Sequence, residues 1–219
     1  MGNNASQSSG VGIDARRLAA NSLLRVERFN VVKPRAANDA LLVASVDPNG
    51  IAVGGSFTLA YTGKLRQARR VTMTINDDDA GGGLTVRAVV TGHRFGVKIV
   101  EELTATSADT NDTVATSVKY FDEVTSIVLK SKTADAGDDI TFGISGAGFG
   151  LPYPIDAVAD VLMIARNNAG TETQIAVSST SVDVTNSAII GLTLAAADDY
   201  EVEFKRSNSR DGFKSNGVF

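Results

Sequence analysis

The one histidine of the chain, His93, is the first residue to consider for catalysis. A histidine base needs a nucleophile to activate, and the sequence has no cysteine and no G-x-S-x-G turn that would present a serine. His93 lies between Gly92 and Arg94 in a segment that reads as a hairpin tip of several residues, where an exposed polar role is expected. One histidine without cysteine also disfavours the usual zinc centres. We therefore predict that the protein is not an enzyme and that it uses no cofactor or metal.

Two further segments contain residue types that bind ions. The adjacent carboxylates of Asp77, Asp78 and Asp79 offer hard oxygen ligands, which calcium prefers. Calcium loops, however, space their carboxylates at alternate positions and close with a bidentate glutamate, so a solvated loop is the favoured interpretation. The alternating glycines of residues 146–150 lead into Leu-Pro-Tyr-Pro and not into a helix, which argues against a phosphate-binding loop. A calcium- or carbohydrate-binding β module stays open as an alternative.

The charge balance limits the classes of partner. The chain of 219 residues has 21 Lys+Arg and 25 Asp+Glu, and its formal net charge is −4. An acidic protein lacks the broad positive surface that nucleic-acid binding requires. No stretch approaches the ~20 apolar residues that cross a bilayer. We predict neither a nucleic-acid partner nor a membrane association.

The N-terminal region departs from this acidic balance, because cations outnumber anions between Val11 and Arg35. Asp14 can cap a helix there, and a partial apolar stripe follows, so residues 12–32 are predicted to include a short helix. A solvated helix face is one interpretation. Arginine, however, is enriched at protein interfaces, so docking onto an acidic partner is the other. The candidate docking residues are Arg16, Arg17, Leu23, Leu24, Arg25, Val26 and Arg28.

From Asp39 onward, apolar residues recur with a period of two between turn signals, as in antiparallel strands. Residues 51–61 follow this pattern and are predicted to form one of the strands. The prolines of residues 151–154 cannot donate to a strand ladder, so we place a boundary there. The sequence predicts an all-β protein, an antiparallel β-sandwich or jelly-roll-like body with an N-terminal arm that contains a short helix.

Four regions follow from this pattern. Residues 1–38 are predicted to be a flexible tail and basic docking arm, and residues 39–154 the main antiparallel β domain. Residues 155–205 are predicted to be a C-terminal β region that forms a second small sheet or completes the first. Residues 206–219 are predicted to be a mobile tail.

Five pieces of sequence in the middle of the chain occur in a characteristic order. They are LTVRAVVTGHRFG at 84–96, VEEL at 100–103, VKYFDEVTSI at 118–127, AGDDI at 136–140 and GLPYP at 150–154. This order resembles that of β-rich virion proteins of tailed bacteriophages, most of all the capsid decoration (cement) proteins. His93 and Arg94 stand where those proteins have an acidic residue at a hairpin tip.

The resemblance implies a structural protein that binds the outer surface of a capsid and braces neighbouring capsomers. Its implied partner is the major capsid protein, its location the capsid exterior of the virion after synthesis in the bacterial cytoplasm, and its implied assembly a homotrimer. A protein that binds only the assembled shell stabilises it by RT ln(1 + [L]/Kd), about 4 kcal/mol per site at a thousandfold excess over Kd. Another virion component, such as a tail, adaptor or fibre-base protein, is the alternative.

Overall fold

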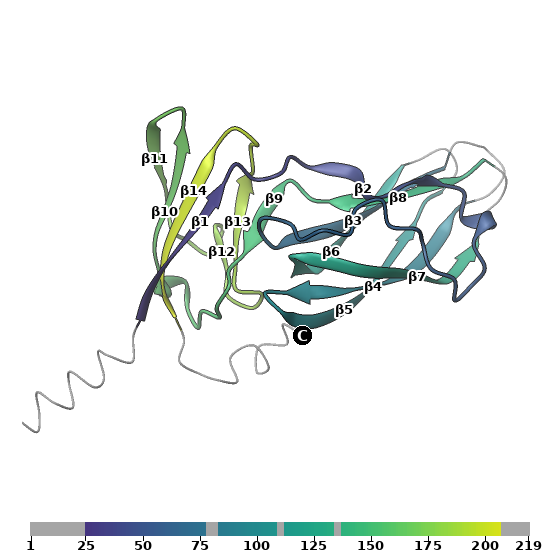
Figure 1. Ribbon diagram of the computed structural model, residues 1–219, viewed down its shortest axis with the longest axis horizontal. Coiled ribbons are helices and arrows are strands. Elements are labelled where there is room, and N and C mark those ends of the chain that lie inside the picture. The colour runs from purple at the N-terminus through teal and green to yellow at the C-terminus, as the bar shows by residue number, and fades with distance from the viewer. Residues whose placement is uncertain (1–24, 78–82, 109–111, 134–136, 207–219) are drawn as a thin grey trace, which may run out of the picture.

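The computed structural model of the chain describes residues 25–77, 83–108, 112–133 and 137–206 (Figure 1). These residues form antiparallel β-strands and two short 3-10 helices, η1 (Pro48–Gly50) and η2 (Val158–Asp160), so the predicted all-β fold class is confirmed. No helix in these ranges is long and apolar enough to span a membrane. The strands are β1 (Arg25–Val32), β2 (Asn38–Val46), β3 (Arg69–Asn76), β4 (Thr85–Arg94), β5 (Val97–Thr106), β6 (Thr113–Phe121), β7 (Glu123–Thr133), β8 (Asp139–Ile144), β9 (Ala147–Gly150), β10 (Val161–Asn168), β11 (Thr171–Ile175), β12 (Val182–Asp183), β13 (Ala188–Thr193) and β14 (Asp199–Arg206).

The strands form two β-sandwiches, which lie end to end in Figure 1. In the first sandwich, a sheet of order β2-β8-β3-β6 packs on a sheet of order β5-β4-β7. The period of two places its core: along β4, Val86, Ala88 and Val90 are fully buried whereas Arg87 between them is exposed. In the second sandwich, a sheet of order β1-β14-β10-β11 packs on a sheet of order β12-β13-β9 around a separate core.

The prediction of a helix within residues 12–32 is wrong for the part of this segment that the structure describes, Arg25–Val32. These residues form β1, which pairs with β14 along its whole length, from Arg25 opposite Arg206 to Val32 opposite Asp199. Phe29 and Val31 point into the second core, so the alternation of apolar residues there is that of a strand. Pairing with β14, which lies far away in the sequence, overrides the helical propensity of the segment.

The strand predicted over residues 51–61 is also wrong, because it is reduced to an isolated bridge between Ser56 and Val128. Gly54 has a φ of +86°, which takes the backbone out of the extended region. Around that bend, Gly54 N donates to Leu129 O at 2.8 Å, and Phe57 N donates to Ile127 O at 2.9 Å. The segment therefore covers an edge of the first sandwich, and the Phe57 side chain is buried in its core.

The two sandwiches meet at the turn between β4 and β5. This turn is shorter than the predicted hairpin tip, because Thr91–Arg94 still belongs to β4 and only Phe95 and Gly96 form the turn. Phe95 has a φ of +48°, and its ring packs edge-on against Phe29 of β1 at a centroid distance of 6.1 Å. The tip of the first sandwich is thereby anchored in the second.

Arg94 secures the same junction from inside the protein, with 2 % of its surface exposed. Its Nη1 donates to Asn186 O at 2.6 Å, and its Nη2 donates to Leu151 O at 2.9 Å and to Ser187 O at 2.7 Å. All three acceptors belong to the second sandwich or its loops. Burial lowers the pKa of Arg94 to about 10, so the guanidinium stays charged at neutral pH.

The buried position of Asp122, beside this junction, predicts how pH affects the stability of the protein. Burial raises the pKa of its carboxyl above the ordinary value of 3.8. The folded protein therefore holds this proton to higher pH than the unfolded chain does, and stability is lost as the pH rises from the unfolded pKa through the folded pKa. Asp122→Asn removes this loss. In urea unfolding from about pH 3.5 to about pH 8, we expect the stability advantage of Asp122→Asn over the parent to grow with pH and then level off; an advantage that shrinks with pH would contradict the assignment.

Candidate functional site

The predicted docking residues fall into two groups. Arg16, Arg17, Leu23 and Leu24 lie outside the described residues. Arg25, Val26 and Arg28 lie on β1, where the backbone of Arg25 pairs with that of Arg206 and the side chains of Val26 and Arg28 are exposed. The structure thus brings part of the predicted docking segment onto one face of the second sandwich.

We call this surface the outer face: the side of the β1-β14-β10-β11 sheet that points away from the second core. On β14, Tyr200, Val202 and Phe204 are buried, so the residues between them point outward. Strand pairing arranges the outer face in four rows, numbered from the end at which Arg25 and Arg206 lie. Row one is Val26 and Lys205; row two is Arg28, Glu203 and Met163; row three is Asn30, Glu201, Ala165 and Gln174; row four is Val32, Asp199, Asn167 and Glu172.

Arg28 holds the middle of the outer face together. Its Nε lies 3.0 Å from Glu203 Oε1 and 3.1 Å from Glu201 Oε1, and its Nη2 also bonds Glu203. The hydrogen bond to Glu203, with the charges of Glu201 and Glu203, raises the pKa of Arg28. This side chain, predicted to dock on a partner, already binds across β1 and β14 within its own sheet.

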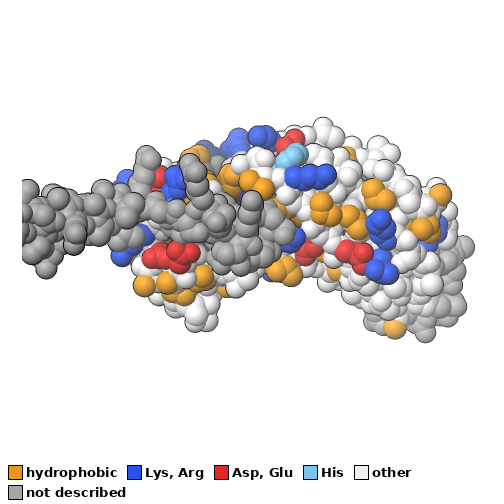
Figure 2. Space-filling model, turned by 90° about the horizontal axis from the view of Figure 1, so that it is seen from below, with side chains coloured by type: hydrophobic (Ala, Val, Ile, Leu, Met, Phe, Trp, Pro, Cys, Tyr) orange, Lys and Arg blue, Asp and Glu red, His pale blue; other side chains and the backbone are white. Residues whose placement is uncertain are grey.

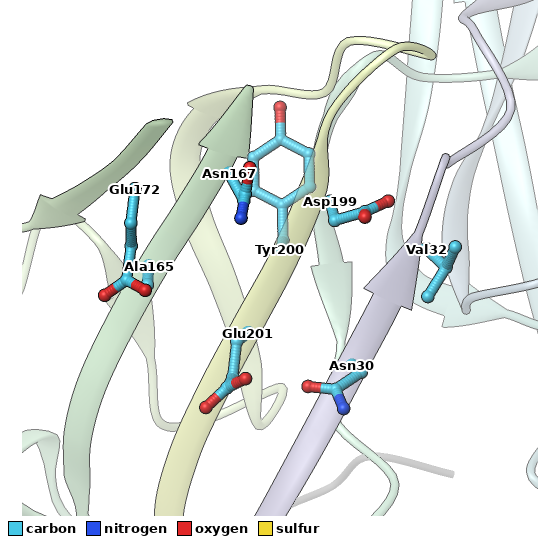
Figure 3. Close-up of a pocket in the computed structure, with 8 residues that line it drawn as sticks. All are labelled: Asn30, Val32, Ala165, Asn167, Glu172, Asp199, Tyr200 and Glu201. Atoms are coloured by element: carbon cyan, nitrogen blue, oxygen red, sulfur yellow. The ribbon is translucent and has the colours of Figure 1, made fainter. Parts of the chain in front are cut away.

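Rows three and four form a groove of about 240 Å³, which we call the acidic groove (Figure 3). Figure 3 shows its polar side chains arriving from four strands: Asn30 from β1, Asp199 and Glu201 from β14, Asn167 from β10 and Glu172 from β11. Asp199 accepts a hydrogen bond from Lys33 N at 2.9 Å. Lysine and arginine side chains are absent from the described residues that line the groove. It can therefore hold a cationic group between carboxylates and amides.

A second depression, which we call the apolar groove, lies beside row two, where β10 begins and β11 ends. Its volume is about 390 Å³. Leu162, which is 44 % exposed, lies in the bulge where the pairing of β10 with β14 shifts register. The remaining walls are Met163, Ile164, Gln174, Ile175, Ala176 and Val177.

Both described chain ends lie at one end of the outer face, because Arg25 is paired with Arg206 (Figure 1). We call this end the terminal pole. The segments that continue from it, residues 1–24 and 207–219, contain Arg16 and Arg17 on one side and Arg210 and Lys214 on the other. The first sandwich lies at the other end of the molecule. On the side of the first sandwich that Figure 2 shows, hydrophobic and charged side chains are interspersed. The two segments that contain these basic residues therefore continue from neighbouring positions, Arg25 and Arg206.

The other candidate residues have structural partners. His93 lies within β4, with its Nδ1 3.2 Å from Glu123 Oε2. Asp77 is buried and accepts a hydrogen bond from Leu84 N at 3.3 Å, whereas Asp78 and Asp79 lie outside the described residues. Within the ranges that the structure describes, no three His, Cys, Asp or Glu side chains are grouped so that they could hold a metal ion.

Sequence reasoning missed two features. The carboxylates of the acidic groove alternate with buried residues along β14, as in Asp199-Tyr200-Glu201, so their shared face was visible, but their neighbours on β1, β10 and β11 were not. Arg94 has the same parity on β4 as the core residue Val90, which was the available signal for its burial.

Comparison with known proteins adds one remote similarity. No protein-family model matches the chain, and no curated protein matches it. Among solved structures, it is similar to a chain in the structure of infectious bursal disease virus, Gx strain, with 11 % sequence identity and a TM-score of 0.26. The match covers 85 % of this chain and 38 % of the viral chain.

Proposed function

We propose that this chain is a structural protein of a bacteriophage particle, which binds the outer surface of the capsid through its terminal pole and braces neighbouring capsomers. The observation that carries the proposal is that both described chain ends, Arg25 and Arg206, are paired at one end of the sheet, and that the sequence beyond each of them contains basic residues. The order of motifs in residues 84–154, which resembles that of capsid decoration proteins, supports it.

The position of β1 suits a tether. An arm that holds two bodies together must be fixed at its root, and β1 is paired with β14 over eight residue pairs. The ion pairs of Arg28 with Glu201 and Glu203 reinforce the same contact on the outer face. A contact made by the N-terminal arm is therefore transmitted to the second sandwich and, through Arg94, to the first.

Charge reversal in the arm tests the proposal. We expect the double variant Arg16→Glu and Arg17→Glu to bind capsid shells at least about tenfold more weakly than the parent, which corresponds to ~1.4 kcal/mol, because electrostatic anchors then become repulsive. The measurement is co-sedimentation with shells of the phage whose genome encodes the chain, at low and high salt.

The matched control is Lys98→Glu with Lys130→Glu, which makes the same change of net charge on exposed residues of the first sandwich. We expect this control to bind shells like the parent. Electron microscopy of the bound particles should then show density over the shell surface. Density confined to the tail would favour a tail, adaptor or fibre-base protein, and equal binding of the arm variant and the control would overturn the proposed docking.

The acidic groove favours one second candidate, a carbohydrate-binding β module. Amide and carboxylate groups such as those of Asn167 and Glu172 are suited to hydrogen bonds with sugar hydroxyls. This alternative predicts that a glycan panel raises the melting temperature of the parent and leaves that of Glu172→Ala unchanged.

A further inference from the structure

We propose that a small monocarboxylate, a molecule with one carboxylate group and a short aliphatic tail, binds in a pocket at the junction of the two sandwiches. This pocket, which we call the junction pocket, has a volume of about 220 Å³. Its lining comes from both sandwiches and includes Arg70, Val118 and Tyr120 of the first and Ala147, Asp183 and Ile190 of the second. The inference goes beyond the proposed function, because it concerns the junction and not the terminal pole.

Arg70 of β3 provides the cation for a carboxylate ligand. Its Nε donates to Ser117 O, which fixes the guanidinium against β6. Its two terminal nitrogens, Nη1 and Nη2, form no hydrogen bond or ion pair with any residue that the structure describes, and the side chain lines the pocket. A pair of guanidinium N–H groups matches the two oxygens of a carboxylate. Arg70 can therefore anchor the charged end of the ligand.

The hydroxyl of Tyr120 provides a second donor. Tyr120 lies opposite Arg70 in the pairing of β6 with β3, so the two side chains are neighbours on one face of the sheet. Tyr120 is 1 % exposed, and its hydroxyl makes no hydrogen bond within the described part of the chain, whereas a buried tyrosine hydroxyl usually has a partner. Burial raises the pKa of Tyr120 to about 12, so the hydroxyl is protonated at neutral pH and can donate. A carboxylate bound beside Arg70 would accept from both side chains.

The charges around the Tyr120 hydroxyl favour a ligand with a single negative charge. Three guanidinium groups act against the effect of burial and lower the pKa of this hydroxyl: those of Arg70, Arg94 and Arg69. The carboxylate of Asp183 raises it. Hydrogen bonds from Asn186 N at 3.0 Å and from Asn186 Nδ2 at 2.7 Å hold that carboxylate in place. It repels a dianion such as phosphate about twice as strongly as a monoanion, so the pocket is suited to a carboxylate.

The rest of the pocket wall suits an aliphatic tail. Val118 is 58 % exposed, and Ala147 and Ile190 line the pocket with it. Burying these side chains against an aliphatic tail is favourable in proportion to the apolar area removed from water. The tail must be short, because pockets for drug-sized ligands begin at roughly 300 Å³. Butyrate combines such a tail with one carboxylate.

Titration of the full-length protein with butyrate, followed by NMR, tests the assignment. We expect the backbone amide signals of Asn186 and Gly191, which line the pocket, to shift with butyrate at constant ionic strength. Tyr120→Phe removes the donor hydroxyl and keeps the ring, and Arg70→Gln removes the guanidinium. Each variant is expected to bind butyrate about tenfold more weakly than the parent, because each loses a hydrogen bond to a charged group.

The matched controls are Tyr61→Phe and Arg87→Gln, which remove a hydroxyl and an exposed guanidinium elsewhere on the first sandwich. We expect both controls to bind butyrate like the parent. Butyramide, which has the shape of butyrate without its charge, is expected to leave the amide signals of the parent unchanged.

Three results would overturn the proposal: an unchanged spectrum of the parent with butyrate, equal shifts with butyramide, or the same affinity in the pocket variants as in the controls. The first two use only the parent protein, so they do not depend on the folding of a variant. Tighter binding of inorganic phosphate than of butyrate would overturn the choice of a monocarboxylate. No shell is present in this experiment, so none of its outcomes bears on the proposed function.

Discussion

Replacing Arg94 with alanine is expected to lower the free energy of unfolding by about 3–5 kcal/mol, since each of the three carbonyl groups that it serves would lose its donor at a cost of roughly 1–3 kcal/mol before water relaxes into the site. These acceptors, on Asn186, Leu151 and Ser187, lie in the second sandwich, whereas Arg94 lies in the first. The loss should therefore uncouple the two sandwiches. Urea unfolding followed separately by signals from each sandwich should change from one transition to two.

Arg87→Ala is the matched control, because Arg87 lies on the same strand but forms an exposed ion pair with Glu102. Exposed pairs contribute about 0–1 kcal/mol, so this variant should unfold much like the parent. Equal losses in the two variants would show that Arg94 does not hold the junction.

Replacing Gly92 with alanine is expected to cost about 3 kcal/mol, near the upper end of the range for overpacked sites. A Cβ atom at this position would lie 2.0 Å from Glu123 O and 2.9 Å from Phe121 Cδ1. The backbone of β7 would have to move away from β4, at the place where their register already shifts between Thr91 and Gly92. Thermal unfolding of the purified variant measures the effect.

Gly50→Ala provides the comparison, because a Cβ atom there has nothing within 4 Å. Its expected effect is within about 0.5 kcal/mol. If Gly92→Ala were as stable as Gly50→Ala, the close approach of β4 to β7 would not be a constraint on the sequence.

The strands and the junction residue Arg94 show what the sequence could and could not predict about the fold. Strands such as β4 and β5 were predictable, because they are neighbours in the sequence, pair with each other and bury alternate residues. β1 was not predictable, because its partner β14 lies more than 160 residues away and the local helical propensity indicated the wrong structure. The role of Arg94 was not predictable either, because it depends on another contact between residues far apart in the sequence. Its guanidinium donates to Asn186 O, in a loop that only folding brings close to residues 84–96.

The candidate site was predictable to a similar degree. The excess of cations before Arg35 indicated a docking arm. Part of that segment, residues 25–32, forms β1 in the structure. The acidic groove draws its side chains from strands whose neighbours are set by long-range pairing, so Glu172 and Asn30 share a surface that no local pattern indicates. The carboxylates of β14 alone, read as alternate residues of a strand, would have predicted an acidic face without its other walls.

The direction of β1 has a mechanical consequence. A pull at Arg25 that is directed along the axis of β1 is opposed by β14, which runs beside β1 in the opposite direction over eight residue pairs. Such a load shears the ladder lengthwise, so its hydrogen bonds share the force and must rupture together, whereas a pull across the strands would open them one after another. The second sandwich is therefore expected to resist tension applied at the N-terminal end of β1 and directed along the strand.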